Sequence, residues 1–116
     1  MNLFEWLLIG HLVGDFLLQT GWMAEKKEKE IWPLVAHSLV YTASVGLLAL
    51  LGGGLSLPAI ALIFLTHLLL DKRSFVNFWT YQITRSSDSM WLKIIIDQSW
   101  HIIILAFATL IPSCLS

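Results

Sequence analysis

Long apolar stretches alternate with short polar ones along the whole chain. Four of them, at residues 3–22, 33–51, 57–73 and 91–111, approach the ~20 residues that a helix needs to cross a bilayer. The pattern predicts an all-α protein, an integral membrane bundle of four transmembrane helices that forms a single domain over residues 1–116. The first stretch lacks the basic start of a signal peptide, so we interpret it as a retained span.

The connections between these spans differ in polarity. Residues 25–30 form a charge run, which we interpret as a solvated loop, and a Gly-rich turn follows the second span at residues 52–54. The third span either breaks near Lys72 or continues. Residues 74–90 lead to the fourth span, and a short helix in the membrane interface and an ordered loop explain their aromatic pattern equally well. Apolar side chains recur there at near-helical spacing, at Phe75, Phe78, Trp79 and Ile83.

The cations predict an orientation in the membrane. Lysine and arginine gather at the first and third connections and are absent from the Gly-rich turn and the C-terminal residues: Lys26, Lys27, Lys29, Lys72, Arg73, Arg85 and Lys93. By the positive-inside rule, both charged connections are cytoplasmic. Both termini and the Gly-rich turn are then outside, as an even number of spans requires.

Composition agrees with a membrane protein. Hydrophobic residues make up 57% of the chain and charged residues 13%, whereas soluble domains carry about 25% charged residues. A net charge of −1 provides no positive surface for DNA or RNA, so we expect no nucleic-acid partner. Membrane lipids are the expected partners, and a homo-oligomer is compatible with the sequence. The single cysteine, Cys114, excludes an intramolecular disulfide and a cysteine-based zinc cluster.

Each predicted span carries one histidine, and three of the four histidines have an aspartate four residues away. Residues at this spacing share one face of a helix. Because the order of the pair reverses in the antiparallel fourth span, all three pairs point the same way, with the aspartate nearer the cytoplasm. This predicts two layers ~6 Å apart, about one helical turn. The upper layer holds His11, Tyr41, His67 and His101, and the lower layer holds Asp15, His37, Asp71 and Asp97.

These layers predict a metal site in the cytoplasmic half of the bundle. Buried carboxylates repel one another unless a positive charge lies between them, and imidazole with carboxylate is a good ligand set for Zn, Mn or Fe. We expect one or two divalent ions, with zinc preferred. A proton relay without metal and a purely structural hydrogen-bond network are the alternatives. The candidate ligands are His11, Asp15, His37, His67, Asp71, Asp97 and His101.

Some of these side chains and their neighbours are also candidates for other roles. The candidate catalytic residues are Asp15, Asp71 and Asp97, any of which could act as a general base when it does not bind metal. Polar side chains close to the two layers are expected to support the ligands or to contact a substrate: Gln19, Tyr41, Lys72 and Gln98. For Lys72, ordinary snorkelling to the membrane surface is the simpler interpretation.

Three motifs resemble those of a known family. They are His11-x-x-Gly14-Asp15-Phe16-x-x-Gln19, His67-x-x-x-Asp71-Lys72 and Asp97-Gln98-x-x-His101. The chain resembles, over nearly its whole length, a family of small four-span bacterial inner-membrane proteins catalogued as a domain of unknown function. The resemblance implies a multi-pass protein of the bacterial inner (cytoplasmic) membrane and supplies no activity.

A more distant similarity concerns the chemistry of the site. Histidine and aspartate on membrane helices are similar to those of membrane-bound metal-dependent hydrolases and of ceramidase-like hydrolases, which hold zinc with three His and one Asp. The similarity implies that His11, His67, His101 and one aspartate play those parts. This chain has fewer spans than the ceramidase-like fold, so the analogy concerns site chemistry only.

The favoured function is therefore a membrane-embedded metal-dependent hydrolase that acts on a lipid or amphiphilic substrate. A cation or proton transporter or channel could use the same His/Asp cluster, although the outer half of every span is almost wholly apolar. In a third interpretation, the protein is an accessory membrane subunit whose metal ion only stabilises the helical bundle.

Overall fold

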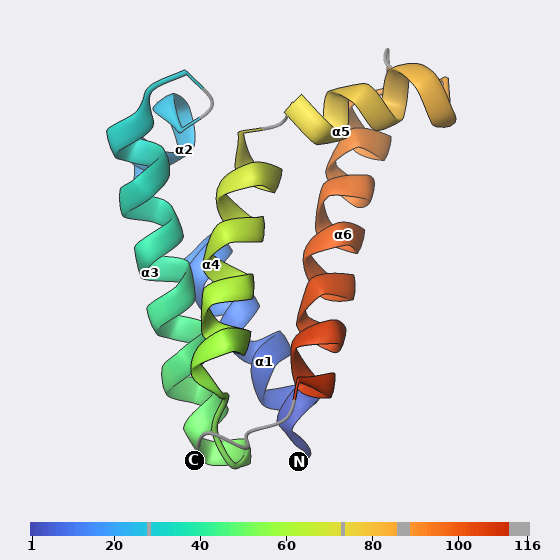
Figure 1. The fold of residues 1–116 in the computed structure, drawn as a ribbon. Helices are drawn as coiled ribbons and strands as arrows, with labels where there is room; N and C mark the ends of the chain where they lie inside the picture. Colours follow the sequence, from blue (N-terminus) through green and yellow to red (C-terminus); the bar gives the residue numbers. More distant parts are fainter. Residues whose placement is uncertain (28, 73, 86–88, 112–116) are drawn as a thin grey trace.

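Helices account for every regular element in residues 1–27, 29–72, 74–85 and 89–111, the parts of the chain that the computed structural model describes. This confirms the all-α class. Figure 1 shows the helices packed as a bundle with α2 and α5 at one end and the N-terminus at the other. Arg73, Cys114 and the Glu28 position of the charge run lie outside the described residues.

The first apolar stretch does not form one continuous helix. Helix α1 (Leu3–Leu12) begins at Asn2, which forms a capping box with Glu5, and it passes into a π-helical turn, η1 (Val13–Leu17). Thr20 then caps a separate short helix, α2 (Gly21–Lys26), because its hydroxyl accepts a hydrogen bond from the Met23 amide. The helical run that starts at Leu3 therefore ends at Leu17, before the predicted end of the span near residue 22, and a new helix begins after Thr20.

The next two helices form a hairpin closed by the Gly-rich turn. Helix α3 (Ile31–Ala49) continues as a 3-10 turn, η2 (Leu50–Gly52), and Gly53 follows with φ of 109°. That left-handed conformation is accessible to glycine without strain. Helix α4 (Leu57–Asp71) begins at the cap residue Ser56 and ends at Lys72. The predicted third span, to residue 73, therefore breaks at Lys72 rather than continuing.

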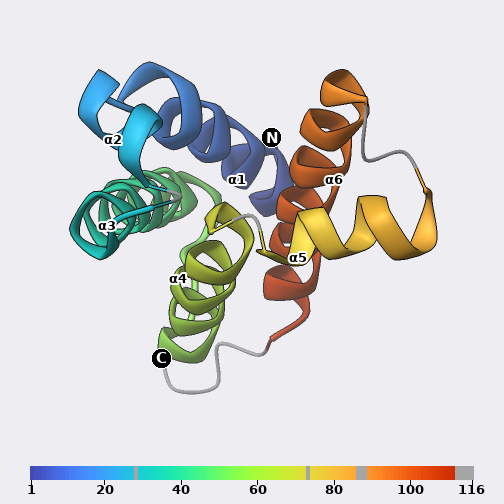
Figure 2. The same cartoon turned by 90° about the horizontal axis from the view of Figure 1, so that it is seen from above.

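The connection to the last helix is itself helical. Helix α5 (Ser74–Phe78) passes into a second π-helical turn, η3 (Trp79–Ile83), so the helix rather than the ordered loop is found. Helix α6 (Met90–Leu110) completes the bundle. Figures 1 and 2 show α5 lying across the bundle axis at the end where α6 begins.

Helices α1, α3, α4 and α6 surround a common interior, with α1 against α3 and α6, and α4 against α3 and α6 (Figure 2). Two elements are long and apolar enough to cross a membrane: Ile31–Gly52, of 22 residues, and Met90–Leu110, of 21 residues. Helix α4 is apolar but shorter. The length criterion for a span is thus met by two of the four predicted segments.

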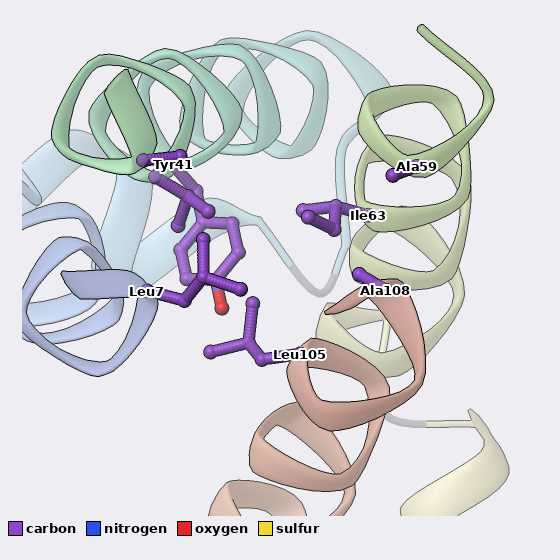
Figure 3. Packing of buried hydrophobic residues seen from close by; sticks show 8 residues of the cluster. Leu7, Tyr41, Ala59, Ile63, Leu105 and Ala108 are labelled. Carbon is purple, nitrogen blue, oxygen red and sulfur yellow. The ribbon is translucent and has the colours of Figure 1, made fainter. Parts of the chain in front are cut away.

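The apolar core fills the half of the bundle nearer the Gly-rich turn. It is formed by all four main helices, and Figure 3 shows side chains of α1, α3, α4 and α6 pointing toward one another. Close approach of α1 to α3 supports this packing, because a Cβ added at Gly10 would lie only 2.7 Å from the Val45 Cα. The core residues are Leu7, Tyr41, Val45, Ala49, Ala59, Ile63, Leu105 and Ala108.

Candidate metal centre

The structure brings all seven predicted ligands into the interior of the bundle. They come from α1, η1, α3, α4 and α6, and none of the seven is more than 5% exposed. The three pairs at four-residue spacing each bring a ring nitrogen near a carboxylate oxygen. The distances are 3.8 Å for His11–Asp15, 3.2 Å for His67–Asp71 and 3.6 Å for His101–Asp97.

Asp71, the last residue of α4, is the centre of this arrangement. Its Oδ2 lies 2.8 Å from the Nε2 of His37 and 3.2 Å from the Nε2 of His67, and its Oδ1 lies 3.3 Å from the Nε2 of His101. Three imidazoles from three helices therefore face one carboxylate. Such an arrangement needs protons or a cation between its members.

Asp15 completes a four-residue group on the side of η1. Its Oδ1 lies 3.0 Å from the Nε2 of His37 and 3.8 Å from the Nε2 of His67. Asp15, His37, His67 and Asp71 each offer one ligand atom within 4.8 Å of the others. Two imidazoles and two carboxylates suit Zn²⁺, Mn²⁺ or Fe²⁺, so the group could hold a metal ion.

The hydrogen bonds of this group fit a cation at its centre. The single Nε2 of His37 faces both carboxylates, but it can donate only one proton. The Nε2 of His67 is buried and has no hydrogen-bond partner among the described residues. A metal ion among these atoms would take the lone pairs that hydrogen bonds leave unused.

A second group shares Asp71 with the first. Asp71, Asp97 and His101 also lie within metal-binding distance of one another. The Nδ1 of His101 donates to the Asp97 carbonyl oxygen at 2.7 Å, so a neutral His101 carries its lone pair on Nε2. That lone pair faces Asp71, and a proton or a metal ion must lie between them.

His11 occupies a different position from the other three histidines. Its Nε2 lies 2.7 Å from the Gln98 Oε1, which can only accept, and its Nδ1 lies 2.8 Å from the Tyr41 hydroxyl. A neutral His11 therefore donates to Gln98 and accepts from Tyr41. Both of its nitrogens are engaged, and His11 belongs to neither of the two groups described above.

The rings of Tyr41, His67, His101 and His11 are neighbours, and the Tyr41–His67 pair is stacked. Tyr41 lies 3.9 Å from His67, ring centroid to centroid, at an interplanar angle of 16°. His101 lies 4.9 Å from His67, and His11 lies 5.7 Å from His101. These four rings are the members expected for the upper layer, and the ring of His37 also lies 4.9 Å from that of His67.

Lys27 is the site residue that the sequence analysis missed. Its Nζ lies 3.0 Å from the Asp71 Oδ2 and donates to the Gln19 Oε1 at 2.7 Å. Gln19 in turn donates to the Asp15 carbonyl oxygen. Lys27 is 11% exposed, so the interpretation of the whole charge run as a solvated loop is wrong at this residue. A signal that could have found it is the polar pair Gln19–Thr20, which interrupts the apolar run between η1 and α2.

The fold and the cluster define a class: a small helical bundle with carboxylates and imidazoles buried together in its interior. The chain belongs to the family described as "Protein of unknown function (DUF3307)", whose model matches residues 3–116. This confirms the resemblance to a domain-of-unknown-function family, and membership carries no activity with it. No curated protein matches the chain, and no solved structure does.

Proposed function

We propose that the protein is a membrane-embedded, metal-dependent hydrolase that acts on a lipid or another amphiphile. The observation that carries this proposal is an inverted polarity. The interior holds His37, Asp71 and their neighbours, whereas the outer surface of the same helices presents large apolar side chains. Examples are Leu39, Leu47, Leu65, Leu69 and Phe107, each more than half exposed.

A bilayer explains this inversion better than water does. Apolar side chains on an outer surface are favourable in lipid, and ionisable side chains in a membrane protein face the bundle interior. We therefore propose four spans in one domain, with the charged connections on the cytoplasmic side and both termini outside. The placement of α2 and α5 at the same end of the bundle (Figure 1) supports this orientation.

The donor set fits a divalent metal ion. Asp15, His37, His67 and Asp71 would hold the first ion, and His101 with Asp97 could join a second one through Asp71. A divalent ion such as zinc supplies Lewis acidity for hydrolysis. With one ion held by the first group, Asp97 would be the candidate general base.

The apolar core supports hydrolysis over transport. A transport pathway needs polar groups on both sides of the central cluster. Here the residues beyond the histidine layer are Leu7, Val45, Ile63 and Leu105, all at most 1% exposed and packed together (Figure 3). Within the described residues, the cluster is therefore connected to one end of the bundle only.

Elemental analysis of the detergent-purified protein tests the proposal. We expect one or two equivalents of a transition metal in the wild type, and loss of that metal in the double variant His67→Ala/Asp71→Ala. Glu25→Gln, which removes an exposed acid outside the cluster, serves as the control and should keep the metal. Circular dichroism establishes that the variants retain their helices.

Turnover is measured on the same preparations. Phospholipid vesicles incubated with the metal-loaded wild type should release a fatty acid or a soluble headgroup, and the double variant should release neither. A wild type without metal after purification free of chelators would overturn the proposal and favour a proton or cation pathway.

A further inference from the structure

A groove on the outside of the bundle lies between α4, α5 and α6. Its volume is about 450 Å³, within the range of roughly 300–1,000 Å³ typical of small-molecule sites. Leu69, Leu70 and Ile104 form apolar walls, and Phe75 and Trp100 meet there edge to face with their ring centroids 5.2 Å apart. Its composition suits a hydrocarbon chain.

The groove adjoins the metal centre. Tyr41, His67 and His101 line a space inside the bundle that is too narrow to admit a water molecule. Three side chains, Thr66, Leu70 and Ile104, line both this space and the groove. A single layer of side chains therefore separates a molecule in the groove from the histidine rings.

One cation lies at the end of this apolar groove. Lys72 lines it, is exposed, and follows Asp71 directly at the end of α4. No salt bridge or hydrogen bond of its ammonium is found within the described parts of the chain. A phosphate bound by Lys72 would lie at about the depth of Asp71, and a hydrocarbon chain below it would run past Thr66 and Ile104.

We propose that this groove binds one anionic phospholipid, with its phosphate on Lys72 and an acyl chain between α4 and α6. We also infer that an anionic phospholipid is the substrate of the proposed hydrolase. This inference rests on the proposed function. The lipid would enter sideways from the bilayer, with its phosphate at about the depth of Asp71 and its acyl ester bonds below it, toward the histidine rings.

Lipid binding is tested without reference to turnover. The purified protein is titrated in detergent with phosphatidylglycerol or phosphatidylcholine and bound lipid is counted by native mass spectrometry. The wild type should prefer phosphatidylglycerol. Lys72→Gln should reduce that preference about fivefold, which corresponds to the roughly 1 kcal/mol of one basic residue near an anionic lipid. Lys93→Gln, a half-buried lysine on α6 outside the groove lining, is the charge-matched control.

A second pair of variants tests the groove walls. Leu69→Trp narrows the groove and should weaken the binding of both lipids, whereas Leu65→Trp, one turn earlier on α4 and outside the lining, should not. Both leucines are exposed, so neither substitution disturbs the core. Equal behaviour of Lys72→Gln and Lys93→Gln, or of the two tryptophan variants, would overturn the site.

Metal content of the same variants separates the two proposals. If the protein binds lipid selectively but holds no metal, the hydrolase proposal is contradicted and the lipid-site proposal is supported. If the protein holds metal but shows no lipid preference, only the lipid-site proposal is contradicted. If both stand, Leu69→Trp should lower lipid turnover while it keeps its metal.

Discussion

The ammonium of Lys27 lies 3.0 Å from the carboxylate Oδ2 of Asp71, and both side chains are largely buried. This contact gives the acidic cluster a fixed positive charge that does not depend on a metal. Lys27 is positioned by Thr20, which starts α2, and by Gln19, which accepts a hydrogen bond from it. A metal bound by Asp71 therefore shares that carboxylate with a lysine of the same chain.

Removal of this charge should destabilise the metal-free protein. In Lys27→Met, the Asp71 carboxylate stays buried and loses its lysine partner, while the imidazoles of His37, His67 and His101 remain beside it. Breaking a buried pair costs about 3–5 kcal/mol, and the 11% exposure of Lys27 favours the lower end of that range. Added Zn²⁺ should restore most of the loss, as thermal unfolding followed by circular dichroism will show. Lys26→Met removes an exposed charge, and an equal loss there would show that Asp71 does not depend on Lys27.

The contact between α1 and α3 should not tolerate even one added methyl group at Gly10. A Cβ at that position would lie 2.7 Å from the Val45 Cα, whereas a Cβ at Gly46 would meet nothing within 4 Å. Gly10→Ala should cost about 1–3 kcal/mol through overpacking. Gly46→Ala should be neutral or stabilising by up to about 1 kcal/mol, because alanine favours helix. Unfolding midpoints of the two variants check this, and similar midpoints would refute the close contact.

Variants of His67 and of His11 should differ in the amount of metal that they bind. Both nitrogens of His11 are engaged by Tyr41 and Gln98, whereas the Nε2 of His67 faces the carboxylates of the cluster. His67→Gln is expected to lower the bound metal at least tenfold, and His11→Gln to retain it with reduced stability. Metal analysis after dialysis against a buffered zinc concentration measures both. Parallel loss in the two variants would place His11 among the ligands, as the sequence analysis expected.

Labelling of single cysteines tests the proposed orientation. In a Cys114→Ser background, Lys26→Cys and Gln82→Cys should react with a membrane-impermeant maleimide only after the cells are opened. Leu57→Cys, at the other end of the bundle beside the Gly-rich turn, should react in cells whose outer membrane alone is permeable. All three side chains are exposed. Reaction of Lys26→Cys and Leu57→Cys from the same side would exclude the four-span arrangement.

The helices and the meeting of the histidines with the aspartates could be predicted from the sequence because they follow from spacing alone. Residues four apart share a helix face, so His67 faces Asp71 and His101 lies beside Asp97. Antiparallel neighbours then bring the pairs to one level, whatever the details of packing. The two longest apolar helices likewise follow from the length of the apolar run.

The remaining features depend on contacts that spacing does not encode. The first helix with its π-helical turn ends at Leu17, and Thr20 caps a new helix although Trp22 beyond it is still apolar. Lys27 returns to the cluster only because α2 reverses the chain. The choice of Gln98 as the partner of His11, rather than a carboxylate, depends on how α1 and α6 are rotated against each other.

The apolar layer around Leu7, Val45, Ile63 and Leu105 also decides which molecules the centre can meet. If the protein is the proposed hydrolase, a centre closed on this side would serve a single leaflet of the bilayer. Lipids in the other leaflet would have to flip across before reaching the histidines. The supply of substrate would therefore follow transbilayer movement and not the total amount of lipid, and the products would accumulate on the side where Lys27 and Lys72 lie.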